Sequence, residues 1–108
     1  MNILIVTAHP SSKGDTHTIA NTYAEAKRAK GDVVTIVDLY SKEYATDVLR
    51  FEAIRECQKT KAQLKFHEQI QSAHEIVMVH PIWWSSVPAI MKNWIDLTIW
   101  PGVAYKYS

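Results

Sequence analysis

Two segments of the chain carry side chains that suit ligand binding, and each follows a short apolar run. The first, residues 8–17, gathers small, polar and basic side chains: Ser11, Ser12, Lys13, Gly14, Thr16 and His17. A loop of this composition that leads into a helix offers free backbone N–H groups and the positive end of the helix dipole to a phosphate. A capped, solvated turn remains an equally open interpretation.

The second segment, residues 80–90, reads His-Pro-Ile-Trp-Trp-Ser-Ser-Val-Pro-Ala-Ile. Trp83 and Trp84 cannot both point into one core from a turn between a strand and a helix, so we expect at least one to be exposed. An exposed indole would form a wall for a flat aromatic ligand. A hydrophobic plug or a dimer contact is the alternative.

Composition places the chain among ordinary globular domains and excludes several classes of function. The 108 residues are 47% hydrophobic, and 12 Lys and Arg residues balance 11 Asp and Glu residues. This even balance predicts no binding to nucleic acid or anionic lipid. No run of about eighteen apolar residues is present, so no membrane span is expected. The apolar start lacks a basic leader and a cleavage site, so it predicts a strand and not a signal peptide.

Metal and disulfide chemistry are not indicated. Cys57 is the single cysteine, which fits a reducing cytoplasm, and we interpret it as a bystander. The histidines show no metal-ligand spacing, so no metal site is predicted. His9 would assist a phosphate and His80 would tune a pocket, although a lone histidine beside a strand is usually structural.

The hydrophobic period alternates between that of strands and that of helices. Short apolar runs predict buried strands at Ile3–Thr7, Val33–Val37 and Glu75–Val79. Helical spacing predicts helices at His17–Lys30, Lys59–Ser72 and Val87–Ile99. The stretch from Leu39 to Arg55 has no clear period and predicts an irregular crossover.

Helix ends and core-facing residues follow from the same pattern. Asp15 or Thr16 is the expected cap of the first helix, Ser85 or Ser86 that of the third, and Gly31 the left-handed residue after the first helix. The expected core-facing residues are Ile19, Ala20, Tyr23 and Ala24 in the first helix, Leu64, Phe66 and Ile70 in the second, and Val87, Ile90, Met91, Trp94, Ile95 and Thr98 in the third.

This order of elements predicts an α/β fold with a doubly wound parallel sheet. If the first strand lies between the other two, the strand order is 2-1-3, and a ligand crevice opens at the carboxyl ends of strands one and three. The two unusual loops flank that crevice. A phosphate cradle beside an aromatic wall suits a flavin, which flavodoxin binds at such a switch point.

Several motifs together resemble the flavodoxin-like NAD(P)H:quinone oxidoreductases. The matching segments are Ile3–Pro10, Val37–Tyr40, His80–Trp84, Pro88–Asp96 and Gly102–Tyr105, which span nearly the whole chain in the family's order. Each segment alone is a weak signal, whereas the combination is specific to that family.

The resemblance implies a role for several residues. In that family the loop that contains His9 and Ser11 and reaches Thr16 and His17 holds the phosphate or ribityl end of the flavin. The residues that line the isoalloxazine correspond to Pro81, Ile82, Trp83, Trp84 and Ser85. Tyr105 and Tyr107 match positions that close over the substrate side. The implied reaction passes a hydride from NAD(P)H through bound FMN or FAD to a quinone or similar acceptor, with no side chain as a nucleophile.

Members of that family are longer, with further strands and a Gly-rich loop after the stretch matching Gly102–Tyr105. We therefore expect residues 1–108 to form a single flavodoxin-like domain that is incomplete at its C-terminus, with an open edge on the third strand. The alternatives are a non-catalytic, flavodoxin-like regulatory partner of a transport system and an inactive interaction domain.

Oligomeric state follows from the aromatic content of the third helix. Trp94 and Trp100 add more aromatic surface than a three-stranded core of this size should bury. This surplus predicts a homodimer through the helix and the Trp100–Tyr107 segment, with the crevice completed by a second subunit or by further sequence.

Overall fold

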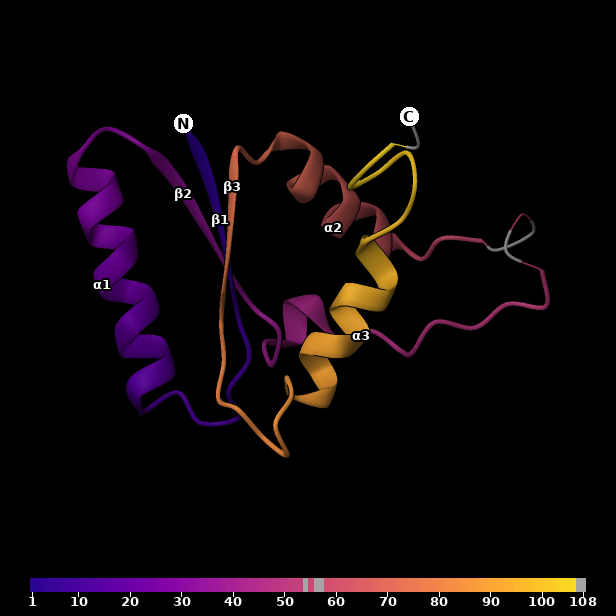
Figure 1. Ribbon diagram of the computed structural model, residues 1–108, viewed down its shortest axis with the longest axis horizontal. Helices are drawn as coiled ribbons and strands as arrows, with labels where there is room; N and C mark the ends of the chain where they lie inside the picture. The colour runs from indigo at the N-terminus through magenta and orange to yellow at the C-terminus, as the bar shows by residue number, and fades with distance from the viewer. Residues whose placement is uncertain (54, 56–57, 107–108) are drawn as a thin grey trace.

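A computed structural model describes residues 1–53, 55 and 58–106 of the chain (Figure 1). Strands and helices alternate along it. Their bounds are β1 Asn2–Thr7, α1 Asp15–Ala29, β2 Val33–Asp38, the short 3-10 helix η1 Lys42–Tyr44, α2 Lys61–Ser72, β3 Glu75–Val79 and α3 Ala89–Thr98. Cys57 and Tyr107 lie outside the described residues.

The three strands form one parallel sheet in the order β2-β1-β3, which confirms the predicted order 2-1-3. In the register, Thr7 of β1 lies opposite Asp38 of β2 and Val79 of β3, so all three strands end together. The central strand β1 is buried from Ile3 onward, as its continuous apolar run predicts. The loops that leave β1 and β3 therefore begin side by side.

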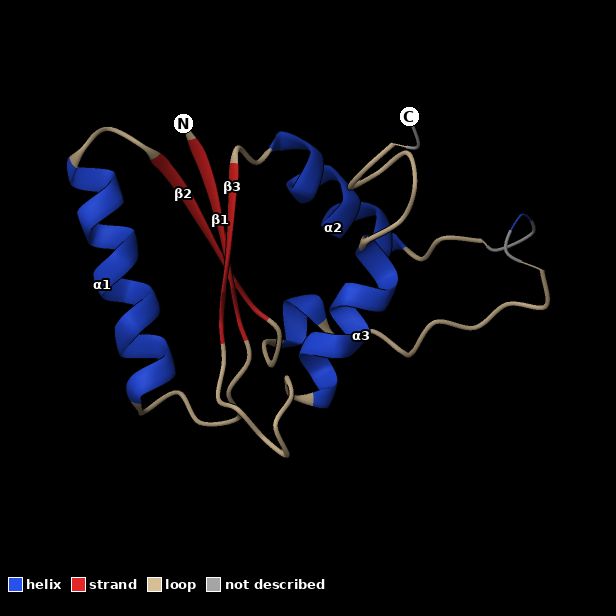
Figure 2. Ribbon diagram, viewed as in Figure 1, coloured by secondary structure: helices blue, strands red, loops and turns tan. Residues whose placement is uncertain are grey.

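Helices cover both faces of the sheet, which confirms the doubly wound architecture. Figure 2 shows α1 on one face and α2 with α3 on the other. Beneath α1, Ile3 and Ile5 of the sheet pack with Ala20 and Ala24. On the second face, the core contains Leu4, Val6, Val37, Phe66, Ile70, Met91, Trp94 and Leu97. Alternate residues of β1 thus belong to two separate hydrophobic cores, one on each face of the sheet.

Of the thirteen predicted core residues, seven are buried, four are partly buried and two are exposed. Ile19 of α1 and Leu64 of α2 are exposed, because each lies just outside the helix face that meets the sheet. Gln63 and His67 occupy the buried face of α2 instead, where their side chains bond to the Leu97 carbonyl. A buried polar pair of this kind has no apolar signature in the sequence.

The predicted helix caps are wrong for both α1 and α3. Gly14 and Pro88 hold the N-cap positions, and neither helix has a side-chain cap. Gly31, with a φ of 91°, does adopt the left-handed conformation expected after α1. Helices α1 and α3 therefore both begin with backbone N–H groups that no side chain caps.

The outer strand β3 is less buried than predicted, since Ile76 and Met78 are both exposed. Within the described residues, its outer edge pairs with no other strand. The open edge of the third strand is thus confirmed. Trp94, by contrast, is only 2% exposed, so the expectation that it is surplus aromatic surface is wrong.

The crossover after β2 is largely irregular, as predicted, and contains the short helix η1. Tyr44 of η1 stacks on Phe66 of α2 with ring centroids 5.7 Å apart. This contact joins the start of the crossover to the core beneath α2.

Candidate functional site

Hydrogen bonds within the loop after β1 hold it in shape. Ser11 N donates to His9 Nδ1 at 3.0 Å, and Lys13 N donates to Ser11 Oγ at 3.1 Å. Nδ1 of His9 also lies 3.3 Å from Ser11 O, and the tautomer in which Nδ1 accepts from Ser11 N has its N–H at Nε2. In that tautomer His9 keeps an N–H donor for a ligand. The Ser11 hydroxyl is occupied within the loop, since it also donates to Lys13 O at 2.8 Å.

The helix that follows this loop has an open N-terminus. Gly14 at the N-cap has a φ of 140°, a conformation that side chains disfavour. The first backbone N–H to bond back is that of Thr18, which donates to Gly14 O at 3.3 Å. The N–H groups of residues 15–17 have no acceptor in the described part of the chain. Free donors at the positive end of a helix dipole form a site for an anion.

Two buried atoms beside this loop also lack hydrogen-bond partners among the described residues. They are Oγ1 of Thr7, the last residue of β1, and Nε2 of His17 in the first turn of α1. Leaving such a group unpaired costs roughly 1–3 kcal/mol, so polar atoms in this state favour a ligand-binding role. Thr7 is not among the site residues predicted from sequence. Its one signal is a hydroxyl at the carboxyl end of an apolar strand.

The loop after β3 is shaped by a strained two-residue turn. Trp83 and Ser86 exchange two backbone hydrogen bonds of 3.1 Å, and between them Trp84 and Ser85 have φ angles of 52° and 58°. Two positive φ angles define a type I′ turn, which favours Asn and Gly. Each residue other than Gly costs about 1–2 kcal/mol in this conformation. This strain could not be read from the Trp-Trp-Ser-Ser sequence.

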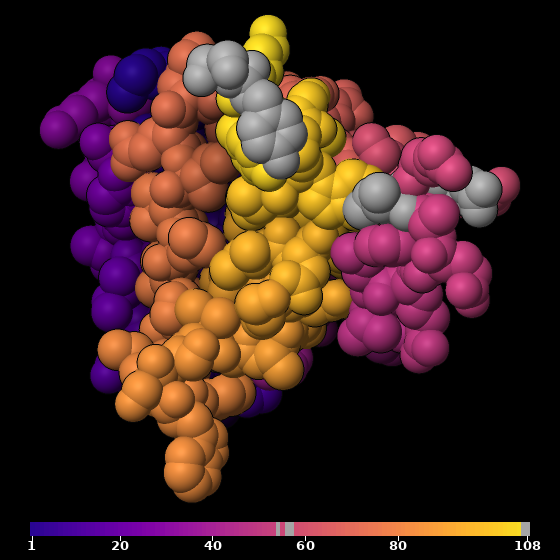
Figure 3. All heavy atoms as spheres, turned by 45° about the vertical axis from the view of Figure 1, so that its right-hand side comes forward, coloured from indigo at the N-terminus to yellow at the C-terminus, as the bar shows by residue number. Residues whose placement is uncertain are grey.

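The strained turn presents apolar side chains to solvent. Trp84 is 100% exposed and Trp83 is 41% exposed, which confirms that at least one indole does not enter the core. Ile82 beside them is also exposed. In Figure 3 the orange atoms that follow β3 project at the bottom of the view. The loop therefore offers a large aromatic surface to another molecule.

The two loops touch each other through His9. Its ring lies 6.4 Å from that of Trp83 and 6.5 Å from that of His17, measured between centroids. Ala8 N also donates to Val79 O at 3.2 Å, which joins the ends of β1 and β3. The predicted phosphate and aromatic halves thus lie together at the carboxyl edge of the sheet.

Tyr105 is not brought to these loops within a single chain. Helix α3 starts next to the loop after β3 and runs away from it. The segment that contains Tyr105 follows the far end of the helix (Figure 1). At 1.5 Å per residue, α3 separates the two by roughly 15 Å. His80 stays within its own loop, where its Nδ1 lies 2.9 Å from Pro81 O.

The described residues contain neither a cluster of metal ligands nor a membrane-spanning helix. No group of three or more His, Cys, Asp or Glu side chains there is arranged to hold a metal ion. No helix in the described part of the chain is both long and apolar enough to cross a membrane.

Known proteins resemble the chain over nearly all of its length. An uncharacterized NAD(P)H oxidoreductase of Haemophilus influenzae is 32% identical over 98% of this chain and 54% of its own length. An FMN-dependent NADH:quinone oxidoreductase of Clostridium beijerinckii is 29% identical over 94% of this chain and 54% of its own. The chain thus spans about half the length of these relatives.

Solved structures give the same fold. An NAD(P)H:quinone oxidoreductase from Methanothermobacter marburgensis superposes with a TM-score of 0.78 at 26% identity, covering 99% of this chain and 54% of that one. The family model for the flavodoxin-like fold matches residues 1–108. With its 2-1-3 parallel sheet and helices on both faces, the chain therefore belongs to the flavodoxin-like fold family.

Proposed function

We propose that this chain binds FMN and serves as an NAD(P)H:quinone oxidoreductase. The observation that carries the proposal is the meeting of an uncapped helix N-terminus and an exposed aromatic turn at the carboxyl edge of β1 and β3. Its supporting relatives are named as FMN-dependent NADH:quinone oxidoreductases. FMN is preferred to FAD because FMN is the flavin that these names specify.

The phosphate of the flavin would lie at the N-terminus of α1. The free N–H groups of residues 15–17, the Thr16 side chain, the His9 ring and the unpartnered Nε2 of His17 suit a dianion there. Ser11 would shape the loop rather than contact the phosphate, because its hydroxyl is already bonded. The orphaned atoms of Thr7 and His17 are the observation that favours this fit.

The isoalloxazine would lie against the loop from Pro81 to Ser85. Trp83 and Trp84 supply its aromatic surface, and the backbone of Pro81, Ile82 and Ser85 completes the wall. Bound flavin would supply the hydride chemistry, whereas the residues of this chain position it and keep water from one face. No side chain at the site is required as a nucleophile.

Tyr105 would act on the site of a second copy. It is exposed and lies beyond the far end of α3, so a homodimer that pairs α3 and the Trp100–Tyr105 segment across the interface would carry it to the partner's loops. Tyr107 belongs to the same proposal. Sedimentation of the flavin-bound protein tests it, since a persistent monomer would leave Tyr105 without a role.

The decisive experiment separates binding from turnover. The purified chain is mixed with FMN, FAD or riboflavin, and retained flavin is measured by its visible absorbance after gel filtration. NAD(P)H oxidation is then followed with a quinone such as menadione. Retention of FMN with quinone-dependent oxidation supports the proposal. Retention without oxidation favours the regulatory-partner alternative, and failure to retain any flavin removes the proposed site. Because a single cysteine is typical of a reducing compartment, we propose that such an enzyme acts in the cytoplasm.

A further inference from the structure

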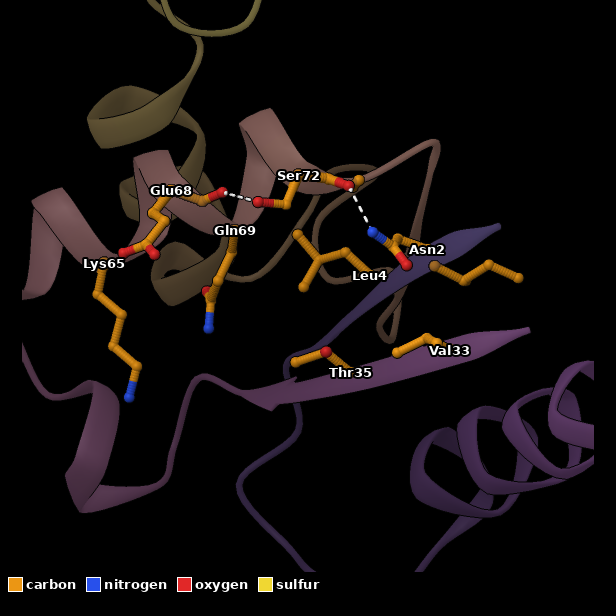
Figure 4. Close-up of a pocket in the computed structure, with 10 residues that line it drawn as sticks. Asn2, Leu4, Val33, Thr35, Lys65, Glu68, Gln69 and Ser72 are labelled. Atoms are coloured by element: carbon orange, nitrogen blue, oxygen red, sulfur yellow. Dashed lines mark hydrogen bonds between the residues drawn. The ribbon is translucent and has the colours of Figure 1, made fainter. Parts of the chain in front are cut away.

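A second candidate site lies at the opposite end of the sheet from the two loops. A cleft of about 360 Å³ opens between α2 and the amino-terminal halves of β1 and β2 (Figure 4). Its volume is within the range of small-molecule sites. None of its lining residues belongs to the loop after β1 or the loop after β3.

The cleft exists because two side chains of α2 are bonded to α3, which holds α2 away from β2. Gln63 Nε2 donates to Leu97 O at 2.9 Å, and His67 Nε2 lies 2.6 Å from the same carbonyl oxygen. These two bonds satisfy a carbonyl in the last turn of α3 and fix the position of α2 over β1. Strand β2 is left uncovered on this face, where Val33 remains 64% exposed. The opening is thus a consequence of how the helices pack.

The floor of the cleft is apolar and its walls are polar. Leu4 and Val33 form the floor, and Gln69 and Ser72 line the α2 side (Figure 4). Asn2 Nδ2 donates to Ser72 O at 3.2 Å, which ties the amino-terminal rim together. A ligand that fits must therefore carry both an apolar body and a polar group.

The charges around the cleft are unevenly paired. Lys65 Nζ lies 2.7 Å from Glu43 Oε1 and 5.1 Å from the centre of the Tyr44 ring, so its charge is already paired. Glu68, which also lines the cleft, has no cation within ion-pair distance among the described residues. The cleft therefore has one uncompensated negative charge.

Neutral groups in the cleft also favour a donor. The buried Oε1 of Gln69 receives no hydrogen bond within the described chain, and its Nε2 is 3.5 Å from the Tyr44 hydroxyl. The Glu68 carboxylate and Gln69 Oε1 are thus two acceptors without a protein donor above an apolar floor, a combination that suits a cationic ligand.

We propose that this cleft binds a small organic cation with a flat apolar body, of the arylamidinium or arylammonium class. The charged group lies beside Glu68 and the Gln69 amide, and the apolar body covers Leu4 and Val33. This site is separate from the proposed flavin site and does not depend on it.

Three probes of nearly equal shape test the charge preference: benzamidine as the cation, benzamide as its neutral counterpart and benzoate as the anion. Each is titrated into the ¹⁵N-labelled chain while backbone and Gln side-chain amide shifts are followed. We expect the largest shifts at Thr35, Gln69 and Val33, and affinities in the order benzamidine, benzamide, benzoate. Equal affinity for benzoate, or shifts scattered over the surface, would overturn the proposal.

Two variants locate the site. Glu68→Gln should lower the preference for benzamidine over benzamide by about two- to fivefold, the range for an exposed ion pair. Val33→Trp should fill the cleft and abolish binding of all three probes. Glu25→Gln, an exposed change on α1 across the sheet, is the matched control and should alter nothing. Should Val33→Trp fail to fold, an unchanged preference in Glu68→Gln alone suffices to reject the proposal.

Discussion

The loop after β1 and the loop after β3 meet at one edge of the sheet but are built in opposite ways. Residues 8–14 are held by hydrogen bonds from His9 and Ser11 to nearby backbone groups, so this loop is shaped before any ligand arrives. Residues 80–86 instead place Trp84 and Ser85 at positive φ and leave Trp84 fully exposed. One loop is preorganised and polar, whereas the other is strained and apolar.

This difference indicates what each loop contributes to the affinity and the orientation of a ligand. Preorganised donors bind an anion without further ordering, which gives a strong and specific contact. Backbone strain and an exposed indole both lower the stability of the folded chain. Strain of this kind commonly marks a functional site. The first loop should therefore dominate ligand affinity, and the second should contribute less affinity but orient the flat ring.

The largest expected effect is on phosphate recognition. Replacing both Thr16 and His17 by Ala should weaken FMN binding by about 1–3 kcal/mol, because hydrogen bonds to a charged group are lost. Affinity for riboflavin, which lacks the phosphate, should change little. Isothermal titration measures both ligands, with Thr22→Ala on the exposed side of α1 as control. An equal loss for riboflavin would show that the first loop does not recognise the phosphate.

A smaller loss is expected at the aromatic loop. Trp84→Ala should reduce FMN and riboflavin affinity alike by about 0.5–1.5 kcal/mol, the usual contribution of an aromatic pair. Thermal stability should stay unchanged, since Trp84 makes no buried contact. Phe51→Ala, a change at an exposed aromatic side chain of the crossover outside both loops, is the control for FMN affinity. If Trp84→Ala binds riboflavin as tightly as the wild type, Trp84 does not contact the flavin and belongs to an interface instead.

The strain itself is testable through stability. Ser85→Gly should raise the free energy of unfolding by roughly 0.5–1 kcal/mol. Gly adopts the φ of 58° without strain, and this gain exceeds the cost of the greater entropy of Gly in the unfolded chain. Ser86→Gly, whose φ is not positive, should instead be neutral or destabilising. Urea unfolding of both variants provides the comparison. If the two Gly substitutions behave alike, the turn is not strained.

The smallest effect concerns pH and lies away from both loops. The hydrogen bond from the Tyr23 hydroxyl to Glu75 raises the pKa of Tyr23 above its ordinary value of 10.0. Because the folded state holds this proton more tightly, the stabilisation is complete below about pH 10 and declines as the pH rises through the raised pKa. Tyr23→Phe and Glu75→Gln should each remove part of the alkaline loss of stability, and the double variant should remove no more. A thermal melt series above pH 9 that is identical for wild type and variants would contradict this.

Much of the fold was predictable because it depends on apolar periodicity. The continuous run in β1 and the stripe containing Met91 and Trp94 each reflect burial against a known neighbour. The caps were not predictable, since Gly14 and Pro88 provide no side-chain signal. Polar anchors such as Gln63 and His67 depend on the Leu97 carbonyl, which is remote in sequence.

The candidate site was predictable in composition but not in conformation. The sequence indicated which loops would meet, because their strands are neighbours in a 2-1-3 sheet. It could not indicate the ring contact between His9 and Trp83 or the positive φ angles of Trp84 and Ser85. These features arise from tertiary packing and turn geometry, which local residue types do not determine.

The central claim is that both loops bind one flavin, and tryptophan fluorescence during an FMN titration tests it most directly. If the isoalloxazine lies on the loop containing Trp83 and Trp84, binding should quench the emission saturably, and Trp84→Phe should remove a large part of the quenching. Simultaneous addition of inorganic phosphate should compete with FMN at the N-terminus of α1. FMN that binds without quenching, or that phosphate cannot displace at any concentration, would show that the two loops do not form one site.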